Sequence, residues 1–116
     1  MPRHKSPWRD LTVRQLRARR AQLVRQLPDV QVTLYGALQH QMRTCGQPGC
    51  GCATGTPHGP YTYFSGRDGP QQRLLYVPAA EAATVTRHVA LTHQLETTLA
   101  DISAINFELL ARGVLD

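Results

Sequence analysis

Three cysteines and one histidine lie within fourteen consecutive residues near the middle of the chain. The stretch reads CGQPGCGCATGTPH, so Cys45, Cys50, Cys52 and His58 follow the spacing C-x4-C-x-C-x5-H. Thiolate and imidazole groups are the usual ligands of zinc, and four of them complete a tetrahedral site. We therefore expect a metal centre here. His40, which precedes the loop, is the alternative to His58 as the fourth ligand.

The expected ion is Zn²⁺ in a structural role. A catalytic zinc keeps one position open for water and usually has a carboxylate nearby as general base. The nearest acids, Asp29 and Asp68, lie outside the loop. The chain also lacks paired carboxylates, a nucleophile–base arrangement and a phosphate-binding glycine loop, so we predict no catalytic residues and no enzymatic activity.

Strand-like segments flank the cysteines. Alternating residues predict strands at Leu38–Thr44, Tyr61–Ser65 and Gln72–Val77, with a turn between the last two. We therefore expect a zinc-loop module over residues 36–78, an antiparallel sheet of two to three strands with the loop at one end. Tyr61 and Tyr63 share a face near Arg43. They either pack in the core or stack on nucleic-acid bases.

Helices are expected on both sides of this module, which makes the fold class α+β. Residues 12–28 form a basic amphipathic helix, which begins with a capping box at Thr12 and Gln15 and stops at Pro28. Residues 1–11 are expected to be a flexible basic arm. Residues 79–113 form a long C-terminal helix that ends at Gly113. Arg20 falls within the apolar stripe of the first helix, so it must find an acid or a partner.

Positive charge is concentrated at the start of the chain. The net charge is +5, whereas residues 1–30 alone carry eight Arg or Lys against Asp10 and Asp29, which gives +6. A basic segment of this kind favours a polyanion such as nucleic acid, with DNA as the first choice, although it is also typical of a solvated helix face. The candidate contacts are Arg3, Lys5, Arg9, Arg14, Arg17, Arg19 and Arg25.

The long helix carries apolar residues at alternating spacings of three and four, which is typical of a coiled coil. Such a helix is longer than a small sheet can cover, so the remainder must pack on the first helix or on a second copy of the chain. We expect a homodimer, because of this excess apolar length. Asn106 at a core position would fix its register, although it could also be a surface residue near a fraying helix end. The candidate contacts are Leu95, Leu99, Ile102, Asn106 and Leu109.

Other features indicate the compartment. No apolar run is long enough to cross a membrane, and the first residues lack the apolar core of a signal peptide. Three cysteines cannot all pair within one chain, which favours reduced, metal-binding thiols over disulfides. We therefore expect a cytoplasmic protein with no membrane partner, associated with the nucleoid if it binds DNA.

Several motifs together resemble a known family. Cys45-Gly-Gln-Pro-Gly-Cys50-Gly-Cys52, then HGPY at 58–61, Tyr76-Val-Pro78 and a long helix containing ISAIN at 102–106 look like a family of short bacterial proteins of unknown function. The resemblance covers about residues 36–110. Its members often lie near transposon genes, which implies a transposition-accessory role. Gly51 stands where similar sequences have a basic residue, so the loop itself is not expected to grip phosphate.

Two functions follow as expectations. The first is a zinc-stabilised, nucleic-acid-binding accessory protein of a mobile element, which contacts DNA through its basic helix and arm and self-associates through its long helix. The alternative is a non-enzymatic adaptor or regulator that docks a recombinase or transposase partner.

Overall fold

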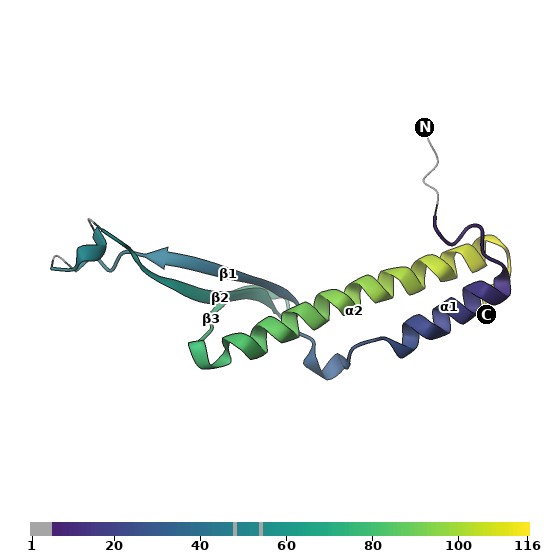
Figure 1. The fold of residues 1–116 in the computed structure, drawn as a ribbon, viewed down its shortest axis with the longest axis horizontal. Coiled ribbons are helices and arrows are strands. Elements are labelled where there is room, and N and C mark those ends of the chain that lie inside the picture. The colour runs from purple at the N-terminus through teal and green to yellow at the C-terminus, as the bar shows by residue number, and fades with distance from the viewer. Residues whose placement is uncertain (1–5, 48, 54) are drawn as a thin grey trace, which may run out of the picture. The chain divides into compact units, whose positions relative to one another are not determined.

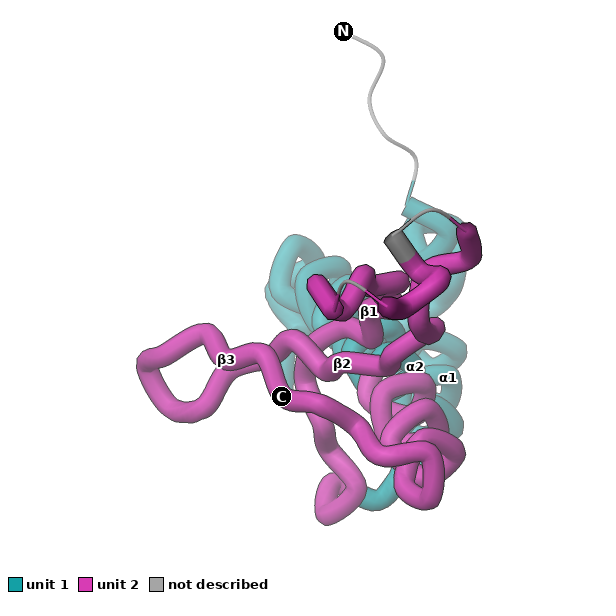
Figure 2. Tube along the Cα trace, turned by 90° about the vertical axis from the view of Figure 1, so that its left-hand side faces the viewer, with its two compact units in different colours: residues 1–29, 93–116 teal, residues 30–92 magenta. Residues whose placement is uncertain are grey.

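The computed structural model describes residues 6–47, 49–53 and 55–116. The fold is α+β, as predicted, and Figure 1 shows its elements. They are α1 (Val13–Arg25), β1 (Gly36–Arg43), β2 (His58–Asp68), β3 (Gln71–Tyr76), α2 (Ala79–Ala111) and two short 3-10 helices, Val30–Val32 and Gly51–Ala53. The chain divides into a helical unit, residues 1–29 with 93–116, and a sheet unit, residues 30–92 (Figure 2).

The first helix begins with the predicted capping box. The Thr12 hydroxyl accepts a hydrogen bond from the Gln15 backbone N–H at 3.1 Å, and the Gln15 side chain accepts one from the Thr12 N–H at 2.9 Å. These two bonds satisfy N–H groups that a helix start leaves without partners. The helix ends at Arg25 rather than at Pro28, because the residue before a proline disfavours helical geometry.

A small apolar core holds the helical unit together. Leu16 and Leu23 of α1 pack with Ile105 and Leu109 of α2, and Leu16, Ile105 and Leu109 are fully buried. Trp8 and Leu11 pack against this cluster. Residues 6–11, predicted to be the end of a flexible arm, therefore form turns that cover the core. Residues 1–5 of the predicted arm lie outside the described residues.

Arg20 finds its partners within the chain. Its guanidinium donates to the Asn106 side-chain oxygen at 2.7 Å and to both carboxylate oxygens of Asp116 at 2.9 Å. This hydrogen-bonded contact lowers the pKa of Asp116 to about 2. Asn106 was predicted to fix the register of a dimer. In the structure its side-chain oxygen accepts this hydrogen bond from α1 of the same chain.

Two residues of the predicted heptad pattern pack within the chain. Leu109 is fully buried, and Ile102 packs against the same core. Leu99 is instead 51% exposed, whereas Ile105 is buried. A straight helix drifts about 20° per heptad from a strict seven-residue repeat, so different positions face the core along its length. Although α2 is long, no helix among the described residues combines the length and apolarity that a membrane span requires.

The sheet has the order β1-β2-β3, and both pairings are antiparallel. All three strands were predicted, but β2 is longer than expected. It pairs with β3 only from Tyr63 to Asp68, so its first part pairs with β1 alone as a two-stranded ribbon. The segment before β1 contains the 3-10 helix Val30–Val32. Its Leu34 N–H donates to the buried Thr92 hydroxyl at 2.8 Å.

Replacing Leu109 with Ala should destabilise the helical unit by about 3 kcal/mol, since it leaves a cavity in a core of few residues. Leu110 is 59% exposed on the same helix, so Leu110→Ala is the matched control and should change the unfolding free energy by less than about 0.5 kcal/mol. Urea unfolding monitored by Trp8 fluorescence measures both. Equal losses for the two variants would contradict the assigned core.

Candidate metal centre

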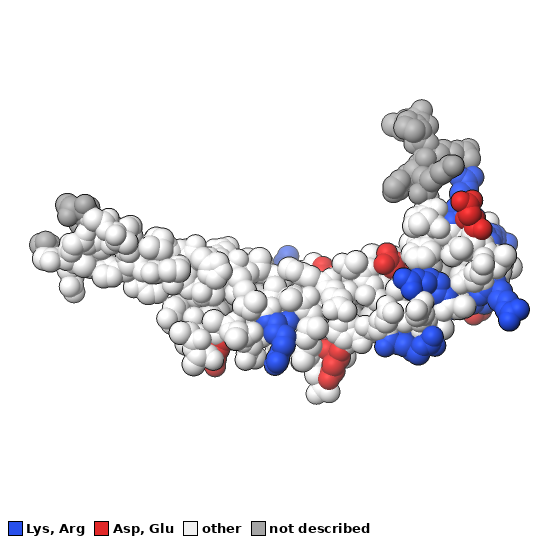
Figure 3. Space-filling model, in the orientation of Figure 1, with Lys and Arg blue, Asp and Glu red and all other residues white. Residues whose placement is uncertain are grey.

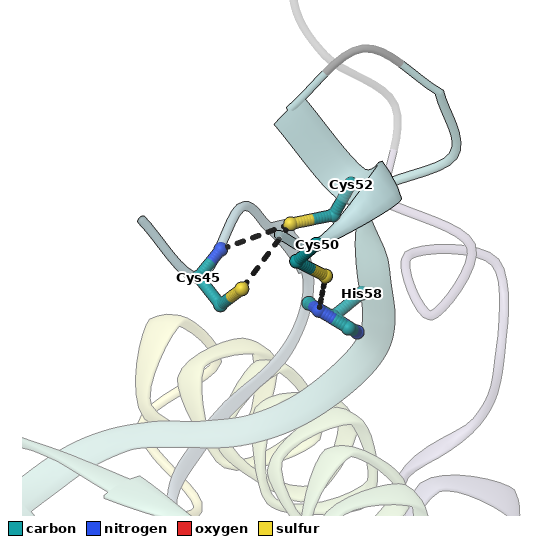
Figure 4. A group of neighbouring side chains, drawn as sticks. All are labelled: Cys45, Cys50, Cys52 and His58. Carbon is teal, nitrogen blue, oxygen red and sulfur yellow. Dashed lines mark hydrogen bonds between the residues drawn. The ribbon is translucent and has the colours of Figure 1, made fainter. Parts of the chain in front are cut away.

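The four predicted ligands meet at the tip of the β1–β2 hairpin (Figure 4). Cys45 follows the end of β1, Cys50 and Cys52 lie at the 3-10 helix of the loop, and His58 opens β2. His58 pairs with Arg43 across the ribbon after an irregularity in the register. Gly59 makes this close approach feasible: its φ is 124°, and a Cβ there would lie 2.8 Å from the Gln41 carbonyl oxygen.

The donor atoms are close enough to share one ion. All four lie within 4.8 Å of one another. The Cys45 and Cys52 sulfurs are 3.4 Å apart, and the Cys50 sulfur is 3.1 Å from the His58 Nε2. A tetrahedral ion with metal–sulfur bonds of about 2.3 Å places its sulfurs about 3.8 Å apart. The cluster therefore fits a closed, four-coordinate metal site.

Short-range backbone contacts shape the loop around these sulfurs. The Cys50 N–H donates to the Gln47 carbonyl at 3.1 Å, and the Gly55 N–H donates to the Gly51 carbonyl at 2.7 Å. The Cys45 N–H donates to the Cys52 sulfur at 3.2 Å. Hydrogen bonds of this type support a thiolate that binds a metal.

Contacts within the cluster shift the pKa values of its four donor groups in both directions. The Gln47 N–H, followed by contacts to the neighbouring thiols and His58, lowers the pKa of Cys45 to about 6. The Cys52 N–H lowers the pKa of Cys50 in the same way. The Cys45 N–H favours the Cys52 thiolate, but burial and the adjacent thiols outweigh it and raise the pKa of Cys52. Contacts first to Cys45 and then to Cys50 raise the pKa of His58.

The other candidate ligand, His40, lies outside the cluster. It faces Thr62 across the β1–β2 pair, and its Nδ1 is 3.1 Å from the Thr62 hydroxyl oxygen. Proximity along the chain had favoured His58, and the structure places that imidazole beside the sulfurs. His40 therefore serves as a natural control for the site.

The predicted nucleic-acid contacts belong to the helical unit. Arg14, Arg17 and Arg25 are exposed on α1, and Arg19, which donates to Gln22 at 2.6 Å, is half-buried. Arg9 is exposed in the turn before α1. Arg3 and Lys5 lie outside the described residues. The described arginines of this set therefore belong to the helical unit, whereas the metal ligands belong to the sheet unit.

One feature next to the cluster was missed by sequence reasoning. A cavity of about 340 Å³, here called the tyrosine cavity, is lined by Tyr61, Tyr63, Tyr76 and Arg43 together with Cys45 and His58. The sequence places Tyr61 and Tyr63 on one face, but Tyr76 joins them only through the register of β3. That register pairs it with Tyr63.

Comparison with known proteins identifies the family. A model described as "Domain of unknown function (DUF6788)" matches residues 13–87, well over half of the chain. The chain belongs to the DUF6788 family. The matched DUF6788 region runs from the first residue of α1 into α2 and includes all three strands and all four ligand residues. No curated protein and no solved structure matches the chain.

Replacing His58 with Gln should remove one of the four ligands. The loss of metal affinity should exceed the loss of about 10–100-fold that is typical when a residue behind a ligand is changed. His40→Gln is the matched control and should keep full metal content. Elemental analysis of the purified proteins, followed by competition with a chromogenic chelator, measures stoichiometry and affinity. We expect one metal ion per chain in the control. A His40 variant that loses metal while the His58 variant keeps it would contradict the assigned ligand set.

Proposed function

We propose that the chain is a zinc-stabilised protein that binds nucleic acid, with DNA favoured, through the arginine face of α1. The observation that carries the proposal is the arrangement of Arg14, Arg17 and Arg25 on the side of α1 opposite the buried Leu16 and Leu23. The metal centre would act as a structural element rather than a catalytic one.

The helical spacing produces this arginine face. Residues separated by three, four or eleven positions share one side of a helix, which groups Arg14, Arg17 and Arg25. All three side chains are exposed. Figure 3 shows Lys and Arg atoms gathered over the region of α1 on the face that is drawn. A guanidinium on an exposed helix can reach phosphate oxygens with paired hydrogen bonds.

Three ion pairs of the described residues use arginines outside this face. They join Arg20 to Asp116, Arg73 to Asp68 and Arg112 to Glu108. Arg17 adds a weaker electrostatic influence on Asp116 and donates to the Val114 carbonyl at 3.0 Å. The alternative role for these arginines, pairing with the acidic end of the chain, is thus taken by Arg20. This supports a polyanion as the partner of the exposed face.

The donor set supports zinc as the ion. Three thiolates and one imidazole suit a borderline-soft divalent ion with tetrahedral preference, and four protein donors leave no open position for substrate. The three cysteines are free thiols. Thiolate ligands persist where disulfides do not form, which favours a reducing compartment such as the cytoplasm.

Changing Arg14, Arg17 and Arg25 together to Gln should weaken binding to a labelled DNA duplex at low salt. Because each phosphate contact releases counterions, the slope of log affinity against log salt should become shallower by about one per contact, up to about three. Fluorescence anisotropy over a salt series measures this slope.

The matched control changes Arg67, Arg73 and Arg87 of the sheet unit to Gln, which lowers the net charge equally. Its slope should stay close to that of the unchanged protein. Equal losses of affinity in the two triple variants would show that net charge alone causes the effect. A protein that binds no duplex or single strand at low salt would refute the proposal.

A second candidate is an adaptor that docks a protein partner. It is favoured by an apolar stripe on α2 in the helical unit, where Leu99, Phe107 and Leu110 are 51%, 72% and 59% exposed. This stripe suits a second copy of the chain, or a recombinase-type partner if the resemblance to proteins encoded near transposon genes extends to function. The same triple Arg variant separates the candidates: lost DNA binding with intact protein association supports the first, and the reverse supports the adaptor.

A further inference from the structure

The tyrosine cavity has the size and lining of a small-ligand site. Its volume of about 340 Å³ falls at the lower end of the range of about 300–1,000 Å³ that is typical of such sites. None of its lining residues is acidic, and Arg43 supplies a positive charge. It lies within the sheet unit, beside the metal ligands Cys45 and His58.

Strand register brings the rings together. Successive side chains alternate between the faces of a sheet, so Tyr61 and Tyr63 project from the same face of β2. Tyr76 pairs with Tyr63 across β2 and β3, and the two ring centroids are 5.7 Å apart in an edge-to-face arrangement. Tyr76 is 52% exposed, whereas Tyr61 and Tyr63 are half-buried. The rings are therefore held by the sheet but remain accessible.

Arg43 completes the arrangement from β1. Its guanidinium carbon lies 5.0 Å from the centroid of the Tyr63 ring, and its Nη2 donates to the Gln41 side-chain oxygen at 2.8 Å. Gln41 and Gln39 lie opposite Tyr61 and Tyr63 in the register. Planar guanidinium, phenol and amide groups thus share one face of the sheet.

We propose that the tyrosine cavity binds an unpaired base of a single-stranded nucleic acid. Aromatic rings on a sheet and a nearby arginine are the elements with which proteins stack bases that are free of a partner strand. Arg43, which lines the cavity, offers a cation to the adjoining phosphate. The base of an intact duplex, stacked on both faces, has no free face to offer.

This inference rests on the proposed nucleic-acid function but assigns a different surface and a different form of the ligand. The arginine face of α1 contacts phosphates and tolerates duplex or single strand. The tyrosine cavity contacts the base itself. A variant of the arginine face should therefore lose affinity for duplex, whereas a variant of the tyrosine cavity should lose the preference for a strand that carries bases.

The test uses the full metal-bound chain and three labelled probes: a ten-nucleotide thymidine strand, the same strand with abasic sites, and a duplex of equal length. Replacing Tyr63 with Ala should weaken binding to the thymidine strand by about tenfold, which is about 1.4 kcal/mol, the scale of one base–aromatic stack. Binding to the abasic strand and to the duplex should change less than twofold. Tyr63→Phe retains the ring and should bind like the unchanged protein.

Tyr35 supplies the matched control, because it is 60% exposed in the sheet unit and does not line the cavity. Tyr35→Ala should bind all three probes normally. If Tyr63→Ala loses metal, Tyr76→Ala on the edge strand takes its place, with an expected loss for the thymidine strand alone. Metal content is measured for every variant.

Three results would overturn the inference. The first is equal binding of the thymidine and abasic strands by the unchanged protein. The second is binding of a proline-rich peptide that depends on Tyr63 while thymidine binding does not. The third is a preference for thymidine that neither Tyr63→Ala nor Tyr76→Ala removes.

The arginine variant of α1 tests the proposed function separately. If that variant loses duplex binding while the tyrosine variants keep the thymidine preference, the proposed function stands and the cavity is rejected. If its duplex salt slope is normal while the thymidine preference depends on Tyr63, the cavity stands and the arginine face is rejected.

Discussion

The β1–β2 hairpin of the sheet unit needs an interaction that holds its two strands together at the tip. Beyond β3 the hairpin is a two-stranded ribbon, and an isolated two-stranded ribbon is at best marginally stable in water. Cys52 is the only buried residue among the described ones of the loop between the strands, so little apolar surface is available to hold it. We propose that one ion bound by three thiolates and an imidazole replaces the missing core and ties both strands together.

The helical unit is stabilised by different means. Four apolar side chains of α1 and α2 form its core, and Arg20 bridges Asn106 and Asp116 beside it. The arginine that lies within the apolar stripe is thereby satisfied internally. The arginines on the opposite side of α1 remain exposed. The proposed nucleic-acid contacts among the described residues consequently lie in the helical unit, to which none of the four metal ligands belongs.

Residue type and spacing predicted those parts of the fold that depend on residues close together in the sequence. The capping box at Thr12, the strands beside the cysteines and the four metal donors follow from residue type and spacing. Long-range register was beyond the sequence alone: Tyr76 joins Tyr63 only because β3 pairs with β2 as it does. The heptad pattern likewise does not reveal which partner covers a helix. Within the chain, Leu109 packs on the leucines of α1, and Asn106 accepts a hydrogen bond from Arg20 of α1.

The most direct test of this account is hydrogen exchange with and without metal. The metal-loaded protein should protect amides between residues 43 and 62, and removal of the metal by a chelator should increase their exchange. Amides near Ile105 and Leu109 should exchange at the same rate in both states, because their core contains no metal ligand. Equal protection of the hairpin tip with and without metal would contradict the central claim that the ion holds the ribbon closed.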